Sequence, residues 1–471
     1  MTSTEGAGVR YLALALILLV CATAALLRPA FAPPQEPQAR ANSTAAIVST
    51  LEQRLGNALP WIGVPGASVA VVRDGQMIDW QTGVTSAWTG ARVRSDTQFE
   101  AASLSKPLTA YAVLRLAQKG RLDLDAAIVR AGHTFTLRQV LSHSAGFDNN
   151  LTAALEPRAS PGQFAYAGAG YLFLGKVIAQ TTGQSFEQHM NSVVLPELQM
   201  THSQFGSRDD APLALPSIDA GLPFAILVFI ATAVGAPILI LHAMAARAWR
   251  STPRFQFRLS RHIIAALAVA SGAAGLHWLV GPQNWPPLTF AGCAMLALGA
   301  GAWLLAARPS LAARGGAVLC AAAFVGLSIV RPPVPIAERK AVFLPAAGLR
   351  TTASDYARFL THILKKADAD AQLSAMLTPQ VRANADHDWG LGIGLQRGET
   401  RSVWHWGVNF PGYQALAVAN RQTGDVAVVL LNGGHMSFAP SGIRYSGLEV
   451  ARSAISAIEG GRHSAYWQGI Q

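Results

Sequence analysis

The chain has 471 residues, of which 51% are hydrophobic and only 13% are charged, an apolar composition for a soluble protein. Its net charge of +11 is unevenly distributed, because residues 222–331 carry eight arginines and no acidic residue. A basic excess in the most apolar part of a chain is typical of loops beside membrane spans and argues against a nucleic-acid-binding groove. Each of the three cysteines lies inside an apolar run, so no disulfide and no metal site is predicted.

The first 32 residues are predicted to direct export. Residues 11–27 are uncharged and follow Arg10, and Ala30-Phe31-Ala32 has the small-x-small pattern of a cleavage site. The run is long for the core of a cleaved signal and short for a membrane span, so segment 1–32 is either a signal peptide or an N-terminal membrane anchor. Both alternatives export the chain that follows.

The part from 44 to 221 mixes helical and strand patterns. A hairpin is predicted at 67–80, where two apolar runs flank Arg73-Asp74-Gly75. Apolar residues at helical spacing predict the helices of this part, and Gly120 and Gly183 end two of them. These helices are expected at 44–59, 103–119, 137–141, 170–182 and 185–194.

The helix expected at 103–119 begins with Ser103-Leu104-Ser105-Lys106, an S-x-x-K tetrad. A spacing of three residues places Ser103 and Lys106 one turn apart on one helical face. A serine hydroxyl becomes a nucleophile when a neighbour accepts its proton, and a lysine does so when burial lowers its pKa. The alternative is a capping serine beside a solvated lysine, since the motif is short.

Four uncharged apolar runs follow, at 222–241, 263–280, 288–307 and 315–330. Each is long enough, or nearly so, to span a bilayer, which predicts a four-helix transmembrane insert at 222–331 rather than buried helices of a soluble protein. Arginines lie in the loops 247–261 and 308–314. The positive-inside rule puts these loops in the cytoplasm and the segments that flank the insert outside, in agreement with export by the N-terminal segment.

The part from 332 to 471 supplies the remaining strands. A second hairpin is predicted at 413–432 around Thr423-Gly424-Asp425. The other expected elements are strands at 390–395 and 402–406 and helices at 348–364 and 447–458. Neither outer part is a convincing fold alone, so 44–221 and 332–471 together predict one extracytoplasmic α/β domain that is interrupted by the insert.

Seven short stretches occur in a fixed order on both sides of the insert. They are GASVAVVRDG at 66–75, SLSK at 103–106, LSHSAGF at 141–147, YAG at 166–168, GLRTTASDYARF at 348–359, WGLGIG at 389–394 and HWGVNFPGY at 405–413. In this order they resemble the serine β-lactamase-related family: class C β-lactamases, penicillin-binding D-alanyl-D-alanine peptidases and related esterases. The resemblance implies a β-lactamase or penicillin-binding transpeptidase-like fold, with an antiparallel sheet flanked by helices and a helical subdomain.

The resemblance also implies roles for individual residues. Ser103 would be the acylated nucleophile and Lys106 its proton acceptor. Tyr166 matches the tyrosine of the family's Y-x-N motif, so it would be a second base and a proton donor to the leaving group. Gly168 stands where that motif has asparagine, and this departure favours an ester or small-amide substrate. His143 matches a structural position of the family and is predicted to be structural.

Residues 405–408 match the K-T-G or H-x-G strand of the family. The resemblance implies that His405 orients the substrate or tunes Tyr166, and that Trp406 and Gly407 contribute to substrate binding. Trp406 would narrow the site. The backbone N–H groups of Ser103 and Val408 would form the oxyanion hole.

These observations predict an exported, multi-pass membrane protein whose catalytic domain lies on the periplasmic side. It would hydrolyse an amide or ester of a small molecule or peptide through a Ser103 acyl-enzyme, without a cofactor or metal. The alternative is a catalytically weak binding or sensing module of the same fold, coupled to the membrane helices. The absent asparagine at Gly168 is the feature that favours this alternative.

Overall fold

The structure is a computed structural model of the chain. It describes residues 41, 43–86, 89–149, 155–206, 213–219, 333–335, 344–397, 402–409, 412–434, 436–439 and 442–459. The chain divides into two compact units. We call the larger one the main unit; it comprises residues 31–217, 338–434 and 445–471.

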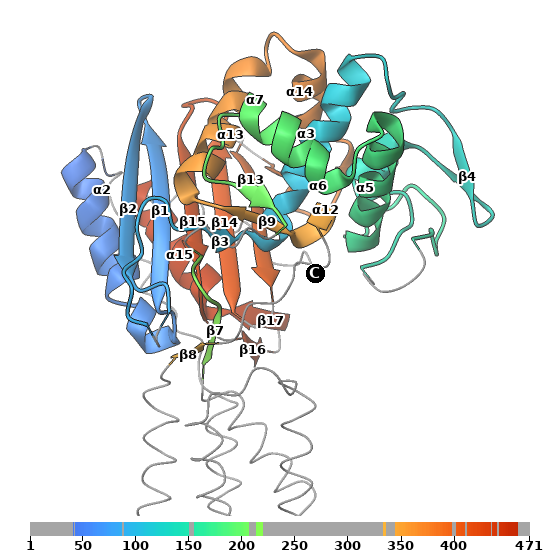
Figure 1. Ribbon diagram of the computed structural model, residues 1–471. Helices are drawn as coiled ribbons and strands as arrows, with labels where there is room; N and C mark the ends of the chain where they lie inside the picture. The colour runs from blue at the N-terminus through green and yellow to red at the C-terminus, as the bar shows by residue number, and fades with distance from the viewer. Residues whose placement is uncertain are drawn as a thin grey trace, which may run out of the picture. The chain divides into compact units, whose positions relative to one another are not determined.

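The main unit is built on an eight-stranded sheet with the strand order β10-β11-β12-β13-β14-β15-β1-β2 (Figure 1). The strands are β1 (Gly66–Arg73), β2 (Gln76–Gly83), β10 (Val381–Arg382), β11 (His387–Trp389), β12 (Gly394–Gln396), β13 (Ser402–Asn409), β14 (Tyr413–Asn420) and β15 (Val426–Leu431). All neighbouring strands are antiparallel. Strand β1 pairs with β15, with Val69 opposite Val429, so the sheet joins segments that lie before and after residues 220–332.

The hairpin predicted at 67–80 is confirmed as β1 and β2, with Arg73 opposite Gln76. The two turn residues, Asp74 and Gly75, have φ angles of 51° and 77°. A two-residue hairpin turn with both central residues in the left-handed region matches the twist of the flanking strands, and Asp-Gly is a favoured sequence for it. The predicted hairpin at 413–432 is likewise confirmed as β14 and β15.

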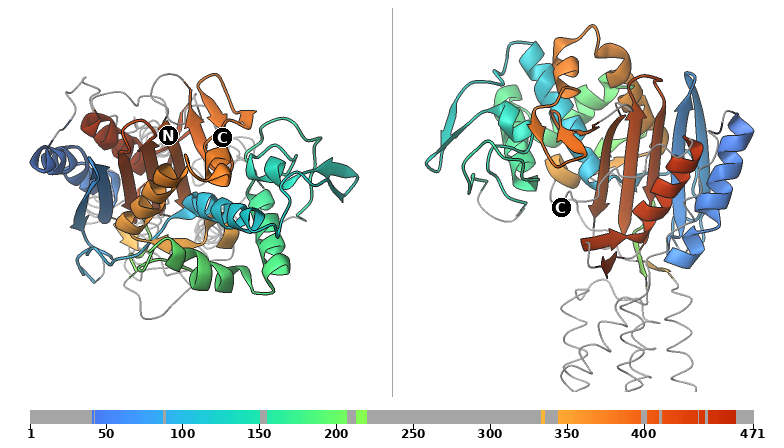
Figure 2. Two further views of the ribbon diagram at one scale, coloured as in Figure 1. Left: turned by 90° about the horizontal axis from the view of Figure 1, so that it is seen from above. Right: turned by 180° about the vertical axis from the view of Figure 1, so that it is seen from behind.

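Helices cover both faces of the sheet (Figures 1 and 2). One hydrophobic cluster joins β1, β14 and β15 to α3 (Ser105–Gln118) and α13 (Ala353–Lys366) through residues such as Val428, Leu108 and Phe359. The other joins the alternate residues of the same strands to α2 (Thr44–Leu51) and α15 (Ser446–Ile458). Because side chains alternate along a strand, apolar residues at every position bury both faces of these central strands.

Further helices, turns and strands complete the described part of the main unit. The helices are α4 (Leu137–Leu141), α5 (Gly168–Thr182), α6 (Phe186–His189), α7 (Leu195–Glu197), α12 (Leu344–Ala347) and α14 (Ala371–Met376), with short 3₁₀ and π turns η1 (Glu52–Gly56), η2 (Leu59–Ile62), η3 (Ala102–Leu104) and η4 (Met190–Val194). The smaller strands are β3 (Phe99–Glu100), β4 (Ile128–Arg130), β5 (His133–Phe135), β6 (Gln204–Phe205) and β9 (Leu349–Thr351). The α/β fold predicted from the sequence, an antiparallel sheet flanked by helices, is therefore confirmed.

Several element boundaries differ from the prediction. The helix expected at 348–364 begins only at Ala353, because Thr352 caps its first turn by accepting a hydrogen bond from the Asp355 N–H and residues 349–351 pair as β9 with β3 and β6. The strand expected at 390–395 begins at Gly394, because Gly392 has a φ of 87° and turns the chain. The helix expected from Ser103 begins at Ser105.

The smaller unit comprises residues 1–30, 218–337 and 435–444. Its described strands form two pairs, β7 (Ser217–Asp219) with β8 (Pro333–Pro335) and β16 (Met436–Ala439) with β17 (Gly442–Tyr445). Within the described ranges, no helix is long and apolar enough to cross a bilayer. The predicted N-terminal export segment and the four apolar runs of 222–331 lie outside those ranges.

Candidate active site

Ser103 lies on a short turn between the sheet and α3. The turn is η3, in which Ala102 has a φ of 49°, an uncommon left-handed conformation for a residue other than glycine. The Leu104 carbonyl accepts a hydrogen bond of 3.0 Å from the Tyr356 hydroxyl, which ties the turn to α13. The two residues on either side of Ser103 are buried, whereas Ser103 itself is partly exposed. This local structure presents the Ser103 hydroxyl at the N-terminal end of α3.

Lys106 lies one turn further on and is 3% exposed. Its Nζ is 2.9 Å from Ser103 Oγ and donates a hydrogen bond of 3.0 Å to the carbonyl of Ala346 in α12. Burial lowers the pKa of Lys106 from 10.5 to about 7, because the ammonium loses its hydration. A lysine that is half neutral near pH 7 can accept the proton of a serine within hydrogen-bond distance.

Tyr166 lies beside the Ser103–Lys106 pair. A side-chain hydrogen bond joins it to Ser103, and the Nζ of Lys106 lies 4.9 Å from the centre of its ring. Burial raises the pKa of Tyr166, and this effect exceeds the opposing effect of the Ser103 hydrogen bond. The phenol therefore keeps its proton at neutral pH, which suits a hydrogen-bond donor better than a base.

Strand β13 passes directly behind Ser103 at Gly407. A Cβ atom on Gly407 would lie 2.6 Å from the Ala101 carbonyl oxygen and 2.7 Å from the Ser103 backbone nitrogen. Only a glycine permits so close an approach of two backbones. Val408 follows on the same strand, so the strand is close enough to Ser103 for the predicted oxyanion hole, whose two N–H groups remain a prediction.

His405 is buried beside Tyr166, and the centres of the two rings are 6.2 Å apart. Its Nδ1 lies 2.8 Å from the Trp406 carbonyl oxygen. A carbonyl can only accept, so Nδ1 carries the proton and Nε2 is a bare acceptor. Burial and the nearby Lys106 lower the pKa of His405 to about 3, although the Trp406 hydrogen bond acts in the opposite direction. His405 is therefore a neutral polar group rather than a cation.

Trp406 does not lie beside Ser103. Side chains alternate along β13, so Trp406 points to the face opposite His405 and Gly407, where its ring packs 5.9 Å from that of Tyr445. The structure thus offers no support for Trp406 as the residue that narrows the site.

Asn409, on the Ser103 side, donates hydrogen bonds of 2.9 Å to Glu100 and 3.1 Å to the Ala347 carbonyl, so both of its amide hydrogens are engaged within the protein.

Gly168 begins α5 and provides no side chain to the site. Its backbone N–H donates a hydrogen bond of 3.0 Å to the Asn149 side chain, which caps the helix in the absence of a capping group at Ala167. Asn149 could not be predicted from the sequence, because its contact with Gly168 spans nineteen residues and no motif marks it. The Ala346 carbonyl was missed for a similar reason, since a backbone acceptor leaves no trace in residue type.

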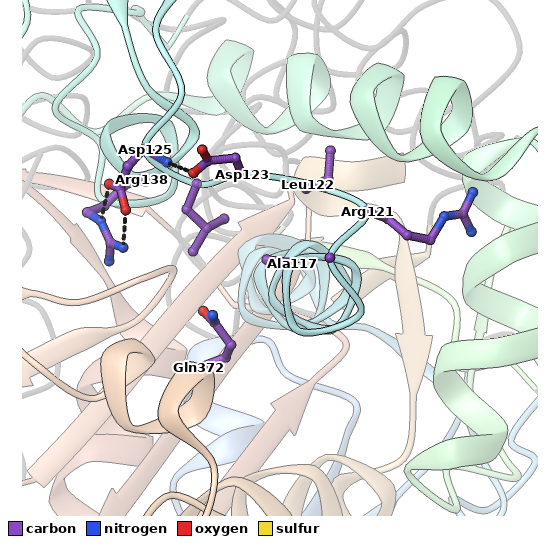
Figure 3. A pocket seen from close by; sticks show the side chains of 9 residues that line it. Ala117, Arg121, Leu122, Asp123, Asp125, Arg138 and Gln372 are labelled. Carbon is purple, nitrogen blue, oxygen red and sulfur yellow. Dashed lines mark hydrogen bonds and ion pairs between the residues drawn. The ribbon is translucent and has the colours of Figure 1, made fainter.

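A hollow of about 440 Å³ lies at the other end of α3 (Figure 3). It is lined by residues that include Ala117, Asp123, Asp125, Arg138 and Gln372, and Arg138 pairs with Asp125 at 2.7 Å. An α-helix rises about 1.5 Å per residue, so the length of α3 separates this hollow from Ser103 by roughly 20 Å. Its residues take no part in the site around Ser103.

Comparisons with known proteins agree with this fold. The beta-lactamase family matches residues 51–451. Solved structures with a similar fold include a class C beta-lactamase, with a TM-score of 0.55, 15% identity and coverage of 88% of this chain and 98% of the other. The D-alanine carboxypeptidase AmpC from Burkholderia cenocepacia has a TM-score of 0.56 and 15% identity, covering 88% of this chain and all (100%) of its own.

Sequence relatives match a shorter segment. Protein flp from Staphylococcus aureus (strain COL) is 28% identical over 174 residues, which are 30% of this chain and 35% of that protein. Penicillin-binding protein 4 from Amycolatopsis lactamdurans is 28% identical over 169 residues, 30% of this chain and 44% of its own. The chain thus aligns with less than half the length of these relatives. The match over residues 51–451, which is most of the chain, shows that the protein belongs to the beta-lactamase family.

Proposed function

We propose that the protein is a serine hydrolase that forms an acyl-enzyme at Ser103. The observation that carries this proposal is the 2.9 Å contact between Ser103 Oγ and the buried Nζ of Lys106. A pKa of about 7 gives Lys106 a substantial neutral fraction at physiological pH. A solvated lysine, the alternative reading of the tetrad, would be fully protonated there and could not act as a base.

The reaction would proceed in two steps. Neutral Lys106 accepts the proton of Ser103 while Oγ attacks the substrate carbonyl, and the N–H groups of Ser103 and Val408 stabilise the negative oxygen. The Tyr166 hydroxyl, which keeps its proton, is positioned to donate to the departing oxygen or nitrogen. Water then attacks the Ser103 ester, and the serine is regenerated as the acid leaves.

We propose an ester or small amide as the substrate. The names of similar structures mention a beta-lactamase, a D-alanine carboxypeptidase and SurE with D-Leu, so a β-lactam or a cell-wall peptide is the second candidate. Neither Gly168 nor Asn409 offers a free side-chain amide to a peptide substrate. Gly168 has no side chain, and the Asn409 amide is engaged with Glu100 and Ala347. A substrate with a small acyl group needs fewer such hydrogen bonds than an extended peptide does.

Covalent labelling tests this function. Purified full-length protein is treated with a fluorescent fluorophosphonate and, separately, with a fluorescent penicillin. Labelling by the fluorophosphonate that is lost in Ser103→Ala supports the hydrolase, and labelling by penicillin as well assigns the peptidase or lactamase branch. Ser105→Ala is the matched control, because this neighbouring hydroxyl is buried and is engaged with the Ala102 carbonyl and the Leu349 N–H. Folded wild-type protein that takes neither label contradicts the hydrolase and favours the sensing module.

We further propose that the main unit is exported and held at the membrane by the four apolar runs of 222–331. The arginine-containing loops and the apolar N-terminal segment support this arrangement. The pairing of β7 with β8 also supports it, because an even number of spans returns the chain to the side from which it left. A cysteine at Val129, which is 76% exposed, reports the location. Reaction with an impermeant maleimide in intact spheroplasts is expected, whereas reaction only after lysis would contradict export.

A further inference from the structure

Tyr166 lies in a segment without regular secondary structure, two residues before α5 begins. A side chain in such a segment needs specific contacts to keep one position. The backbone groups on either side of Tyr166 both bond to one residue. The Ala165 N–H donates 2.8 Å to the backbone carbonyl of His143, and the Ala167 N–H donates 3.0 Å to His143 Nδ1.

The imidazole of His143 also packs against the Tyr166 ring. The two ring centres are 4.5 Å apart and their planes are inclined by 35°. The imidazole also packs against Tyr171, at 5.1 Å and 39°, and Tyr171 is fixed by a hydrogen bond of 2.9 Å from its hydroxyl to the Leu141 carbonyl. His143 therefore contacts both of the tyrosine rings whose faces also approach Nζ of Lys106, at 4.9 and 5.9 Å.

His143 is itself held in an unusual conformation. It is 2% exposed and has a φ of 57°, in the left-handed region that asparagine and histidine tolerate better than most residues. Because an amide N–H can only donate, His143 Nδ1 must be the acceptor and the proton must lie on Nε2. The contact requires a neutral ring, and burial, followed by the charge of nearby Lys106, lowers the pKa of His143.

We infer that His143 is a positioning residue, which holds the 165–167 segment at both ends and so places the Tyr166 hydroxyl against Ser103 and Lys106. This inference rests on the hydrolase function proposed above. It assigns His143 an effect on the reaction that acts through Tyr166 alone, and not a general contribution to the core. Displacement of a catalytic group by about 1 Å can slow a reaction by about 100-fold.

A double-mutant cycle separates these two roles. The rate of fluorophosphonate labelling is measured for wild type, His143→Ala, Tyr166→Phe and the double variant. We expect His143→Ala to slow labelling by about 10- to 100-fold in the wild-type background, and by less than about threefold when Tyr166 is already phenylalanine, because residues that act as a unit are non-additive. Equal effects in both backgrounds, or a His143→Ala variant that labels at the wild-type rate, would overturn the inference.

His143→Asn serves as the conservative variant. Asparagine tolerates the left-handed backbone, and its side-chain oxygen can replace Nδ1 as the acceptor for Ala167, although the ring contacts are lost. We expect it to label faster than His143→Ala, and it can replace the alanine variant in the cycle if the latter does not fold. His133→Ala, on the β4–β5 hairpin, controls for loss of an imidazole elsewhere and should leave the rate unchanged.

A crystal structure of the His143 variant gives a second readout that does not depend on activity. We expect the Tyr166 hydroxyl to move by about 1 Å or more while Ser103 and Lys106 keep their contact. A Tyr166 that stays in place contradicts the inference even if the protein proves inactive. If wild-type protein is not labelled at all, the proposed function fails, whereas this structure still decides whether His143 positions Tyr166.

Discussion

A Cβ atom on Gly407 would lie 2.7 Å from the backbone nitrogen of Ser103, so β13 and the turn η3 are in direct backbone contact. The opposing atoms belong to backbone, which cannot rotate aside as a flexible side chain can. The position of Ser103 relative to the sheet is therefore set by the absence of a side chain at residue 407. The same contact brings β13 close to η3, as the proposed oxyanion hole of the Ser103 and Val408 N–H groups requires.

Gly407→Ala is accordingly expected to slow the labelling of Ser103 strongly, although the substitution adds only one methyl group. The strand and η3 must separate, which displaces Ser103 from its partner Lys106 and slows labelling by at least about 100-fold. Overpacking also lowers the free energy of unfolding by about 1–3 kcal/mol. Labelling rate and thermal midpoint measure the two effects. The matched control is Gly56→Ala, whose Cβ would meet only ordinary contacts of 3.6 Å or more, and a rate equal in both variants would contradict the prediction.

The pH dependence of labelling reports the protonation of Lys106. In the proposed mechanism the neutral amine is the base, and its pKa of about 7 means that the active fraction falls as pH decreases below that value. We expect the labelling rate to fall about tenfold per unit below pH 7 and to level off above it, between about pH 5 and pH 9. His405, with its pKa lowered to about 3, should add no step in this range. A rate that is independent of pH would show that Lys106 is not the base.

The same lysine makes stability depend on pH. In the unfolded chain Lys106 keeps its proton up to its ordinary pKa of 10.5, whereas the folded protein releases it above about 7. The unfolded state thus binds more protons in this window, so the free energy of unfolding rises with pH, by up to about 1.4 kcal/mol per unit. Lys106→Met removes this dependence. We expect the variant to exceed wild type in thermal midpoint at pH 7 and to lose that advantage towards pH 10, and a constant difference would contradict the burial of an ionisable lysine.

The parts of the site that are local in sequence could be predicted from it. Ser103 and Lys106 are three residues apart, and any helical or 3₁₀ turn brings such side chains together. The hairpin at Asp74-Gly75 was predictable for the same reason, since the turn chemistry lies in the two residues themselves. The α/β fold followed from motif order and from apolar strands on both sides of residues 222–331.

Contacts between distant segments could not be predicted. The Ala346 carbonyl bonds to Lys106 across 240 residues, and a backbone acceptor has no signature in the sequence. The expected role of Trp406 followed from its place next to His405 in the motif, but alternation along the strand sends neighbouring side chains to opposite faces. The way His143 holds Tyr166 depends on a left-handed backbone that residue type alone did not reveal.

The short helix α12 links Lys106 to the part of the chain that follows residues 220–332. The carbonyl of Pro345 accepts a hydrogen bond of 2.7 Å from the Thr109 hydroxyl, and the carbonyl of Ala346 accepts one from Lys106. Thr109 is buried on α3, one turn after Lys106. We expect its hydroxyl to help set the distance between the Ala346 carbonyl and the Lys106 amine, the proposed acceptor of the Ser103 proton.

Thr109→Val tests this link with a side chain of similar shape. Loss of the hydroxyl leaves the Pro345 carbonyl without its partner, and we expect the free energy of unfolding to fall by about 1–3 kcal/mol. Because α12 can then shift relative to α3, labelling of Ser103 should slow as well. Thr182→Val is the matched control, since its hydroxyl bonds to the Ile178 carbonyl within α5, far along the helix from Gly168. If both variants lose stability equally and neither slows labelling, α12 does not position Lys106 and serves only to pack the helices together.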